Sequence, residues 1–190
     1  MTEKEILDIF KKANAVLEGH FKLSSGKHSP RYLQCARVLE RPGYAAKLCG
    51  ELSKKFSGEE IDTVIAPALG GILVSYEVAR SLGARALFTE RVEGKMTLRR
   101  GFELGKNNNV LVVEDVITTG LSTREVIDVV KSFGSNVAGV GCLVNRSGEK
   151  IDFEARFEGL LKIEIPTFDP ETCPLCKTGT PLVKPGSRGA

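Results

Sequence analysis

The feature that most constrains the fold is a run of four consecutive apolar residues, VLVV at positions 110–113, followed directly by Glu114 and Asp115. A strand that is apolar at every position is covered on both faces, as a central strand of a parallel sheet is. The two acids then stand at its carboxyl end, the edge where open parallel sheets bind ligands. The run therefore predicts an α/β domain with its functional site just beyond residue 113.

The segments on both sides of this run alternate between strand and helix patterns. Apolar runs typical of strands lie at residues 63–68, 84–89, 110–115 and 137–145, and apolar positions at helical spacing lie at 42–58, 72–82 and 123–133. Alternation of this kind favours parallel strands joined by right-handed crossovers. We predict a single-domain α/β fold with a mostly parallel sheet flanked by helices.

The amino-terminal segment is expected to be an addition to this sheet. Thr2 and Glu5 form a capping box, and the helical spacing that follows predicts an amphipathic helix ending near Gly19. From about residue 20 to 40 the sequence is rich in turn residues and predicts a small hood. Residues 1–165 are expected to form the domain, and 166–190, rich in Pro, Gly and Lys, a carboxyl-terminal tail.

Composition limits the partners. The chain has 190 residues, with 27 Lys and Arg against 24 Asp and Glu, and its net charge of +3 is far below that of a dedicated nucleic-acid-binding protein. No apolar run approaches the roughly 20 residues that span a bilayer, and the first residues lack the apolar segment of a signal peptide. We expect a cytoplasmic protein without a membrane or nucleic-acid partner.

Five cysteines are too few, and odd in number, for a disulfide framework. Cys173 and Cys176 have the spacing of a zinc knuckle, but a structural zinc site needs about four ligands. His20 and His28, the two histidines, lie far away in sequence, so no zinc site is expected within one chain. A site completed across a dimer, a reduced pair and a labile disulfide remain open. The other three cysteines lie in or beside apolar stretches and are expected to be reduced residues of the core: Cys35, Cys49 and Cys142.

The residues after the 110–113 run make a turn suited to a sugar phosphate. Ser122 and Glu125 predict a second capping box, so a helix amino terminus, which favours phosphate, would lie behind the turn. Gly120 permits close backbone approach, and neighbouring hydroxyls are donors. The acids suit sugar hydroxyls or a hydrated Mg²⁺. The simpler alternative is an acidic strand end before an ordinary capped helix. The candidate residues are Glu114, Asp115, Val116, Ile117, Thr118, Thr119, Gly120, Leu121 and Ser122.

This segment resembles the phosphoribosyl-diphosphate (PRPP) signature of the type I phosphoribosyltransferases: four apolar residues, two acids, two apolar residues and Thr-Thr-Gly. Its sequence, EDVITTG, is most similar to the corresponding segment of the orotate phosphoribosyltransferases. The resemblance implies the fold of that family and binding of PRPP by residues 114–122. It also implies Mg²⁺ as a cofactor carried by PRPP without a direct protein ligand, and a homodimer.

Two further segments resemble the orotate enzymes. Residues 19–30 are similar to their Phe-x-Leu-x-Ser-Gly-x-x-Ser-Pro segment, part of a hood over the pyrimidine; a polar surface hairpin is the alternative. Arg146 closes the 137–145 strand where the orotate enzymes bind orotate, so the resemblance implies that Arg146 and Thr118 contact that substrate. A planar guanidinium meets carboxylate and carbonyl oxygens through parallel hydrogen bonds. A solvated surface arginine is the alternative.

The sequence departs from the common orotate pattern at three places. The loop after the 63–68 strand lacks the usual lysine, so the backbone N–H groups of Gly70 and Gly71 are expected to line the diphosphate pocket. The mobile loop lacks its histidine, and Arg91 and Lys95 are the catalytic candidates there, with a solvated basic loop as the alternative. Ser24 stands at a hood position that is basic in many members of the family.

The resemblance implies transfer of a phosphoribosyl group from PRPP to N1 of orotate, which gives orotidine 5′-monophosphate and diphosphate during pyrimidine biosynthesis. The PRPP segment does not by itself identify the acceptor, so a purine-base phosphoribosyltransferase is one alternative, against which the hood and Arg146 argue. A PRPP-sensing regulator that binds nucleic acid is another, and the net charge argues against it.

Overall fold

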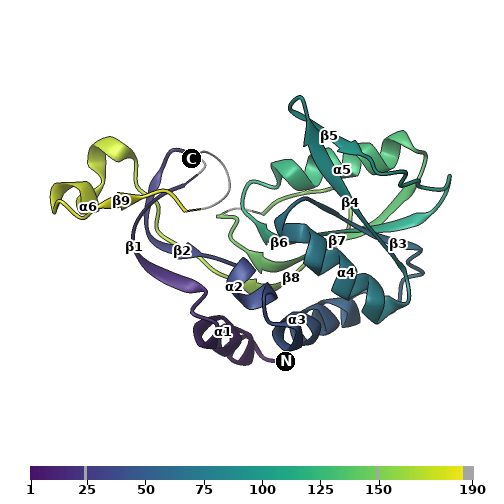
Figure 1. The fold of residues 1–190 in the computed structure, drawn as a ribbon, viewed down its shortest axis with the longest axis horizontal. Coiled ribbons are helices and arrows are strands. Elements are labelled where there is room, and N and C mark those ends of the chain that lie inside the picture. Colours follow the sequence, from purple (N-terminus) through teal and green to yellow (C-terminus); the bar gives the residue numbers. More distant parts are fainter. Residues whose placement is uncertain (24, 149, 186–190) are drawn as a thin grey trace.

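The chain forms two sheets of different size, shown in Figure 1. The computed structural model describes residues 1–23, 25–148 and 150–185, so Ser24 and residues 186–190 of the expected tail lie outside the described residues. The strands are β1 (Val16–Lys22), β2 (His28–Leu33), β3 (Thr63–Pro67), β4 (Arg85–Val92), β5 (Lys95–Leu98), β6 (Asn109–Ile117), β7 (Asn136–Asn145), β8 (Phe157–Lys162) and β9 (Leu182–Val183). The helices are α1 (Glu3–Lys12), α2 (Ala36–Leu39), α3 (Pro42–Lys54), α4 (Gly70–Leu82), α5 (Leu121–Ser132), the short 3-10 turn η1 (Pro170–Thr172) and α6 (Pro174–Lys177).

The larger sheet has the order β5-β4-β3-β6-β7-β8 and confirms the predicted mostly parallel α/β fold. β6 lies between β3 and β7 and is parallel to both, whereas β5 at one edge is antiparallel to β4. Because β3 and β6 are parallel neighbours, their carboxyl ends lie at the same edge of the sheet. The functional residues that follow these strands therefore lie close together.

β6 is buried on both faces, as its sequence predicts. Leu111 and Val113 pack into the core cluster under α3 and α4, whereas Val110 and Val112 pack into the cluster under α5. All four side chains are fully buried, and burial of each contributes about 1.5–3 kcal/mol. Figure 1 shows the sheet between these helices. The three cysteines expected in the core are buried and unpaired: Cys35, Cys49 and Cys142.

The first helix is shorter than predicted. The Thr2–Glu5 capping box is present, but α1 ends at Lys12 and not near Gly19. Asn14 turns the chain at a φ of 50°, and the next residues form β1, whose backbone pairs with β2. The apolar residues after Asn14 fitted a helical spacing, but strand pairing with a distant segment satisfies their backbone groups instead.

The smaller sheet joins the two ends of the chain. Its order is β2-β1-β9, so the described part of the tail adds a strand parallel to β1. On the other edge of the hairpin, Phe168 forms an antiparallel bridge with His28. Figure 1 shows this hairpin and the yellow tail projecting together to one side of the larger sheet. Among the described residues, no helix has the length and hydropathy needed to cross a membrane.

Candidate functional site

The turn between β6 and α5 differs from the prediction at its cap. Gly120, not Ser122, is the N-cap of α5, at a φ of 74°, so the predicted capping box of Ser122 with Glu125 is wrong. Only a residue that tolerates the left-handed region fits there, and a Cβ on Gly120 would lie 2.9 Å from the Phe153 ring. Because glycine has no capping side chain, the N–H groups of Ser122 and Thr123 in the first turn of α5 are available as donors for an anion at this edge.

The other residues of the PRPP-like segment continue from this strand into the helix. Val116 and Ile117 complete β6, and the Ile117 side chain is buried in the core. Thr118 and Thr119 form the exposed turn, and the Thr119 hydroxyl accepts a 3.4 Å hydrogen bond from the N–H of Leu121. Leu121 begins α5 with an exposed side chain, and Ser122 follows it within the first turn. Three hydroxyl residues therefore stand in sequence at the amino-terminal end of α5, and that of Thr119 contacts its first N–H group.

A second helix amino terminus lies beside the same acids. α4 begins at Gly70, two residues beyond the end of β3, and the side chain of its N-cap Leu69 makes no capping hydrogen bond. A Cβ on Gly70 would lie 2.6 Å from Asp115 Oδ2, and one on Gly71 would lie 3.3 Å from Glu114 Oε1. The close approach of Asp115 therefore requires glycine at position 70, and Ala66, whose Cβ would lie 2.7 Å from a Cβ on Gly71, requires it at position 71. The structure brings together the two segments that sequence analysis assigned separately to diphosphate and PRPP.

Glu114 and Asp115 form an enclosed pair of carboxyl groups. Glu114 is buried, and Asp115 accepts a 2.8 Å hydrogen bond at Oδ1 from the Val116 N–H. Burial raises the pKa of Asp115, although hydrogen bonds with Glu114 and the Val116 backbone oppose the rise. A cation or hydroxyl donors beside this pair would favour its ionised form. The pair therefore suits a polyhydroxylated ligand accompanied by a metal ion.

Arg146 lies at the adjacent strand end and has an unsatisfied donor. The backbone N–H of Arg146 donates to the Ile117 carbonyl at 2.8 Å. Asn145 Oδ1 accepts a 2.9 Å hydrogen bond from the backbone N–H of Ser147, and together these bonds fix the turn. Within the described part of the chain, the buried Nε of Arg146 has no hydrogen-bond partner. Burial also lowers the pKa of Arg146. Leaving such a donor unpaired costs about 1–3 kcal/mol, so the position is suited to an anionic ligand.

Tyr32 joins the hood to this site and was not identified from the sequence. It belongs to β2, and burial raises the pKa of its phenol. The negative charge of Asp115 raises that pKa further, and the positive charge of Arg146 opposes it, so the phenol lies within electrostatic range of both. No sequence motif distinguishes Tyr32, because its role depends on how the hairpin packs against the larger sheet.

Arg91 and Lys95 lie in a regular hairpin. β4 and β5 are joined by Glu93 and Gly94, at φ values of 50° and 82°, which is the two-residue turn preferred in hairpins. Arg91 donates to the Gly94 carbonyl and to Glu125 Oε1, each at 2.8 Å, and the hydrogen bond with Glu125 raises the pKa of Arg91. Lys95 pairs with Val92 and is exposed. The basic segment is therefore an ordered hairpin tied to α5.

Comparison with known proteins agrees with this geometry. The family model for the phosphoribosyl transferase domain matches residues 39–170, so the chain belongs to the phosphoribosyltransferases. It is 61% identical over 188 residues to an orotate phosphoribosyltransferase of Desulforamulus reducens, covering 99% of this chain and 98% of that protein. It is 54% identical over 184 residues to the Thermotoga maritima protein of the same name, covering 97% and 98%. Within the larger family it belongs with the orotate phosphoribosyltransferases.

Solved structures support the same fold. The crystal structure of orotate phosphoribosyltransferase from Aeropyrum pernix superposes with a TM-score of 0.70 at 28% identity, covering 83% of this chain and 93% of that one. An adenine phosphoribosyltransferase structure from Trypanosoma brucei matches with a TM-score of 0.62 at 16% identity, covering 81% and 79%, which shows a common fold alone.

Proposed function

We propose that the protein transfers the phosphoribosyl group of PRPP to N1 of orotate and so forms orotidine 5′-monophosphate in pyrimidine biosynthesis. The single observation that carries the choice of acceptor is the buried Nε of Arg146, which has no hydrogen-bond partner among the residues that the structure describes. Orotate has a carboxylate and ring carbonyls that accept hydrogen bonds from a guanidinium. The full-length relatives named orotate phosphoribosyltransferase support the same choice.

The amino-terminal ends of α5 and α4 would bind different phosphate groups of PRPP. The turn from Thr118 to Ser122 would bind the 5′-phosphate at the start of α5, and Gly70 and Gly71 would donate backbone N–H groups to the diphosphate at the start of α4. Between these ends, Glu114 and Asp115 would accept hydrogen bonds from the ribose hydroxyls. The contact of both glycines with these acids supports one continuous binding site.

The residues present suit Mg²⁺ accompanying PRPP. Glu114 and Asp115 supply oxygen donors, and the raised pKa of Asp115 means that a divalent cation nearby would favour its carboxylate form. We propose that these two residues face the hydrated ion without needing to coordinate it directly, since Mg²⁺ keeps several of its waters. When bound, the ion would supply positive charge that stabilises the diphosphate as a leaving group.

The chain's own contribution to the reaction is positioning and charge stabilisation. The bond from C1′ to the diphosphate oxygen breaks, the bond from C1′ to N1 of orotate forms, and the N1 proton would pass to an oxygen of the departing diphosphate. Arg146, with Thr118, would hold orotate so that N1 faces C1′. The N–H groups of Gly70 and Gly71 would stabilise charge on the leaving diphosphate, while the Asp115 carboxylate would stabilise positive charge on the ribose.

We further propose that Arg91 and Lys95 close over the diphosphate and exclude water, as mobile lids do. Their place on a short hairpin supports this, because the hairpin can move as a unit once Arg91 exchanges Glu125 for a phosphate oxygen. We also propose a cytoplasmic homodimer. Exposed apolar side chains at helical spacing at the start of α4, namely Leu69, Leu73 and Tyr76, support a second copy as the partner.

The test is the loss of orotate absorbance when the purified protein is mixed with orotate, PRPP and Mg²⁺, with adenine, hypoxanthine and uracil as parallel acceptors. We expect turnover with orotate alone. Turnover with a purine base at a comparable rate would contradict the acceptor assignment. PRPP binding without turnover of any base would instead favour the sensor alternative.

A further inference from the structure

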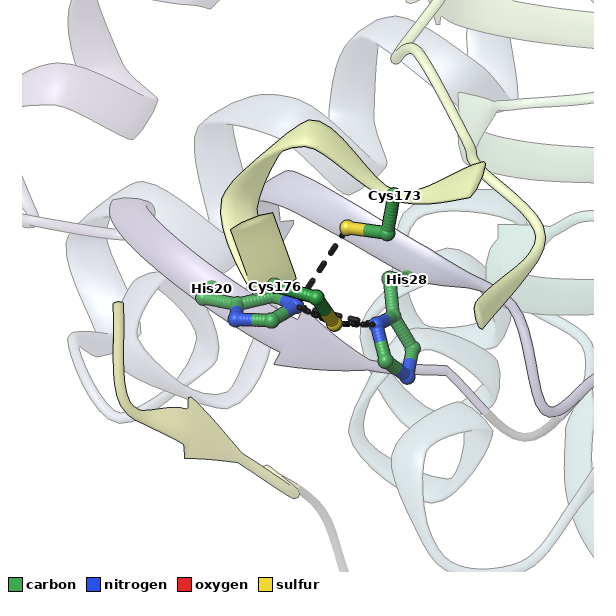
Figure 2. A group of neighbouring side chains, drawn as sticks. All are labelled: His20, His28, Cys173 and Cys176. Carbon is green, nitrogen blue, oxygen red and sulfur yellow. Dashed lines mark hydrogen bonds between the residues drawn. The ribbon is translucent and has the colours of Figure 1, made fainter. Parts of the chain in front are cut away.

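Both histidines and both tail cysteines meet in one cluster, shown in Figure 2. His20 lies on β1 and His28 begins β2. Cys173 is the N-cap of α6, and Cys176 lies within that helix. Their ligand atoms all lie within 4.8 Å of one another. The sequence predicts no zinc site within one chain, because the histidines lie far from the cysteines in sequence. That premise is wrong, because the folded tail brings Cys173 and Cys176 to the two histidines of the hairpin. We propose that these four residues bind one structural Zn²⁺ ion.

The distances between the donor atoms fit a four-coordinate site. His20 Nε2 lies 2.9 Å from His28 Nδ1, 3.5 Å from Cys173 Sγ and 3.7 Å from Cys176 Sγ, and Cys176 Sγ lies 3.3 Å from His28 Nδ1. In a tetrahedron with usual zinc bond lengths, two nitrogens are about 3.3 Å apart and a nitrogen and a sulfur about 3.6 Å apart. These four spacings need changes of only a few tenths of an ångström, and the two remaining pairs, Cys173 with His28 and Cys173 with Cys176, lie within 4.8 Å.

The tautomer of His20 is already that of a metal ligand. Its Nδ1 lies 2.8 Å from the Thr180 carbonyl oxygen, and because a carbonyl can only accept, Nδ1 carries the hydrogen. In the neutral ring, Nε2 then has a free lone pair, and this atom faces His28 and both sulfurs. A hydrogen bond from the second ring nitrogen to a backbone carbonyl is the usual support of a zinc-bound histidine.

The hairpin places both histidines on one face. Lys22 is paired with His28 across the two strands, and His20 lies two residues before Lys22, so it is the diagonal neighbour of His28 on the same side. His20 itself lies within the register shift between Glu18 and Phe21, where a bulge changes the direction of side chains locally. The two rings meet edge to face, with centroids 4.8 Å apart, which leaves their nitrogens directed at the cluster.

The tail has almost no hydrophobic core of its own. Across residues 162–185, all of which the structure describes, Cys173 is the single buried side chain. Leu182 and Val183 of β9 are 45% and 51% exposed, so their burial stabilises this strand little. Small folded segments without a core are usually held by disulfides or metal ions, and both cysteines are free thiols. A metal ion accounts for how this segment folds.

The donor set favours zinc and a structural role. Thiolate and imidazole ligands in tetrahedral arrangement select zinc among the common divalent ions, and four protein ligands leave no open position for chemistry. The hairpin held by the ion continues to Tyr32, whose phenol lies within electrostatic range of Asp115 and Arg146. The zinc would thus attach the tail to the hood and keep the hood over the site.

Metal analysis of the full chain, purified without chelator from zinc-supplemented medium, tests the proposal. We expect one zinc per chain in the wild-type protein and in Cys49→Ala, which removes a buried cysteine outside the cluster, and less than a tenth of that in a Cys173→Ser/Cys176→Ser double variant. Zinc-free wild-type protein that also fails to take up added Zn²⁺, or a disulfide between Cys173 and Cys176 in the native protein, would overturn the proposal.

Three further measurements complete the test, and two of them use only the wild-type protein, so that they do not depend on whether a variant folds. Co²⁺ added to chelator-treated wild-type protein should give the intense visible bands of a tetrahedral thiolate site at one equivalent. Cys176→His, which retains four donors, should still bind one ion. Chelator should lower the melting temperature of the wild-type protein, and Zn²⁺ should restore it. Octahedral cobalt spectra, or a melting temperature that does not respond to chelator, would contradict a structural zinc site.

Discussion

Replacement of Gly120 by alanine tests whether the turn before α5 is constrained by both conformation and packing. At a φ of 74°, an alanine in the left-handed region costs about 1–2 kcal/mol. Its Cβ would also lie 2.9 Å from the Phe153 ring, and overpacking of this kind costs about 1–3 kcal/mol. The sum, about 2–5 kcal/mol, is a large part of the roughly 5–15 kcal/mol that stabilises a domain.

Two other glycines separate these effects. Gly83 also has a positive φ, of 70°, but nothing lies within 4 Å of a Cβ there, so Gly83→Ala should show the conformational cost alone. Gly50 lies within α3 with no neighbour within 4 Å, so Gly50→Ala should stabilise the protein by about 0.5–1 kcal/mol.

Thermal and urea unfolding of the three variants measure the differences. For a chain of this size, each 1 kcal/mol shifts the melting temperature by about 2–4 °C, so we expect a decrease of about 4–20 °C for Gly120→Ala and a smaller decrease for Gly83→Ala. Phe153→Leu should relieve part of the cost when combined with Gly120→Ala. Equal destabilisation by Gly120→Ala and Gly83→Ala would refute the packing argument.

Three other predictions concern the site and the assembly. Arg146→Ala should raise the KM for orotate roughly 10- to 150-fold, which corresponds to a loss of about 1.5–3 kcal/mol for hydrogen bonds to a charged group, and should change the KM for PRPP less. The control Arg80→Ala, on the surface of α4, should change neither KM. Equal effects of Arg146→Ala on both KM values would contradict the role of Arg146. Because burial raises the pKa of Asp115, this group stabilises the fold most at low pH, and its contribution is lost as pH rises through the folded pKa. In Asp115→Asn, the free energy of unfolding should therefore fall less than in the wild type as the pH rises above about 4. The variant should also use PRPP poorly. If urea unfolding gave the same pH profile for both proteins, the pKa of Asp115 would not be raised. Tyr76→Glu should shift a homodimer to monomer in analytical ultracentrifugation, and an unchanged sedimentation coefficient would exclude this face of α4 as the interface.

The sequence alone determined the features that depend on local patterns. The apolar run at 110–113 predicts a central strand because covering both faces requires apolar residues at every position, and β6 has that place. Pro42 begins α3, and Thr2 caps α1, since both effects involve residues within one turn. The PRPP-like segment was identifiable because one strand, one turn and one helix end provide it.

Only the tertiary structure decided the features that depend on distant partners. Residues after Asn14 fit a helix by spacing, but pairing with β2 makes them a strand. The cap of α5 lies at Gly120 because Phe153 and the left-handed backbone leave room for no side chain there. His20 and His28 meet Cys173 and Cys176 because β9 and Phe168 attach the tail to both edges of the hairpin. Such contacts join residues far apart in the chain, so no local pattern records them.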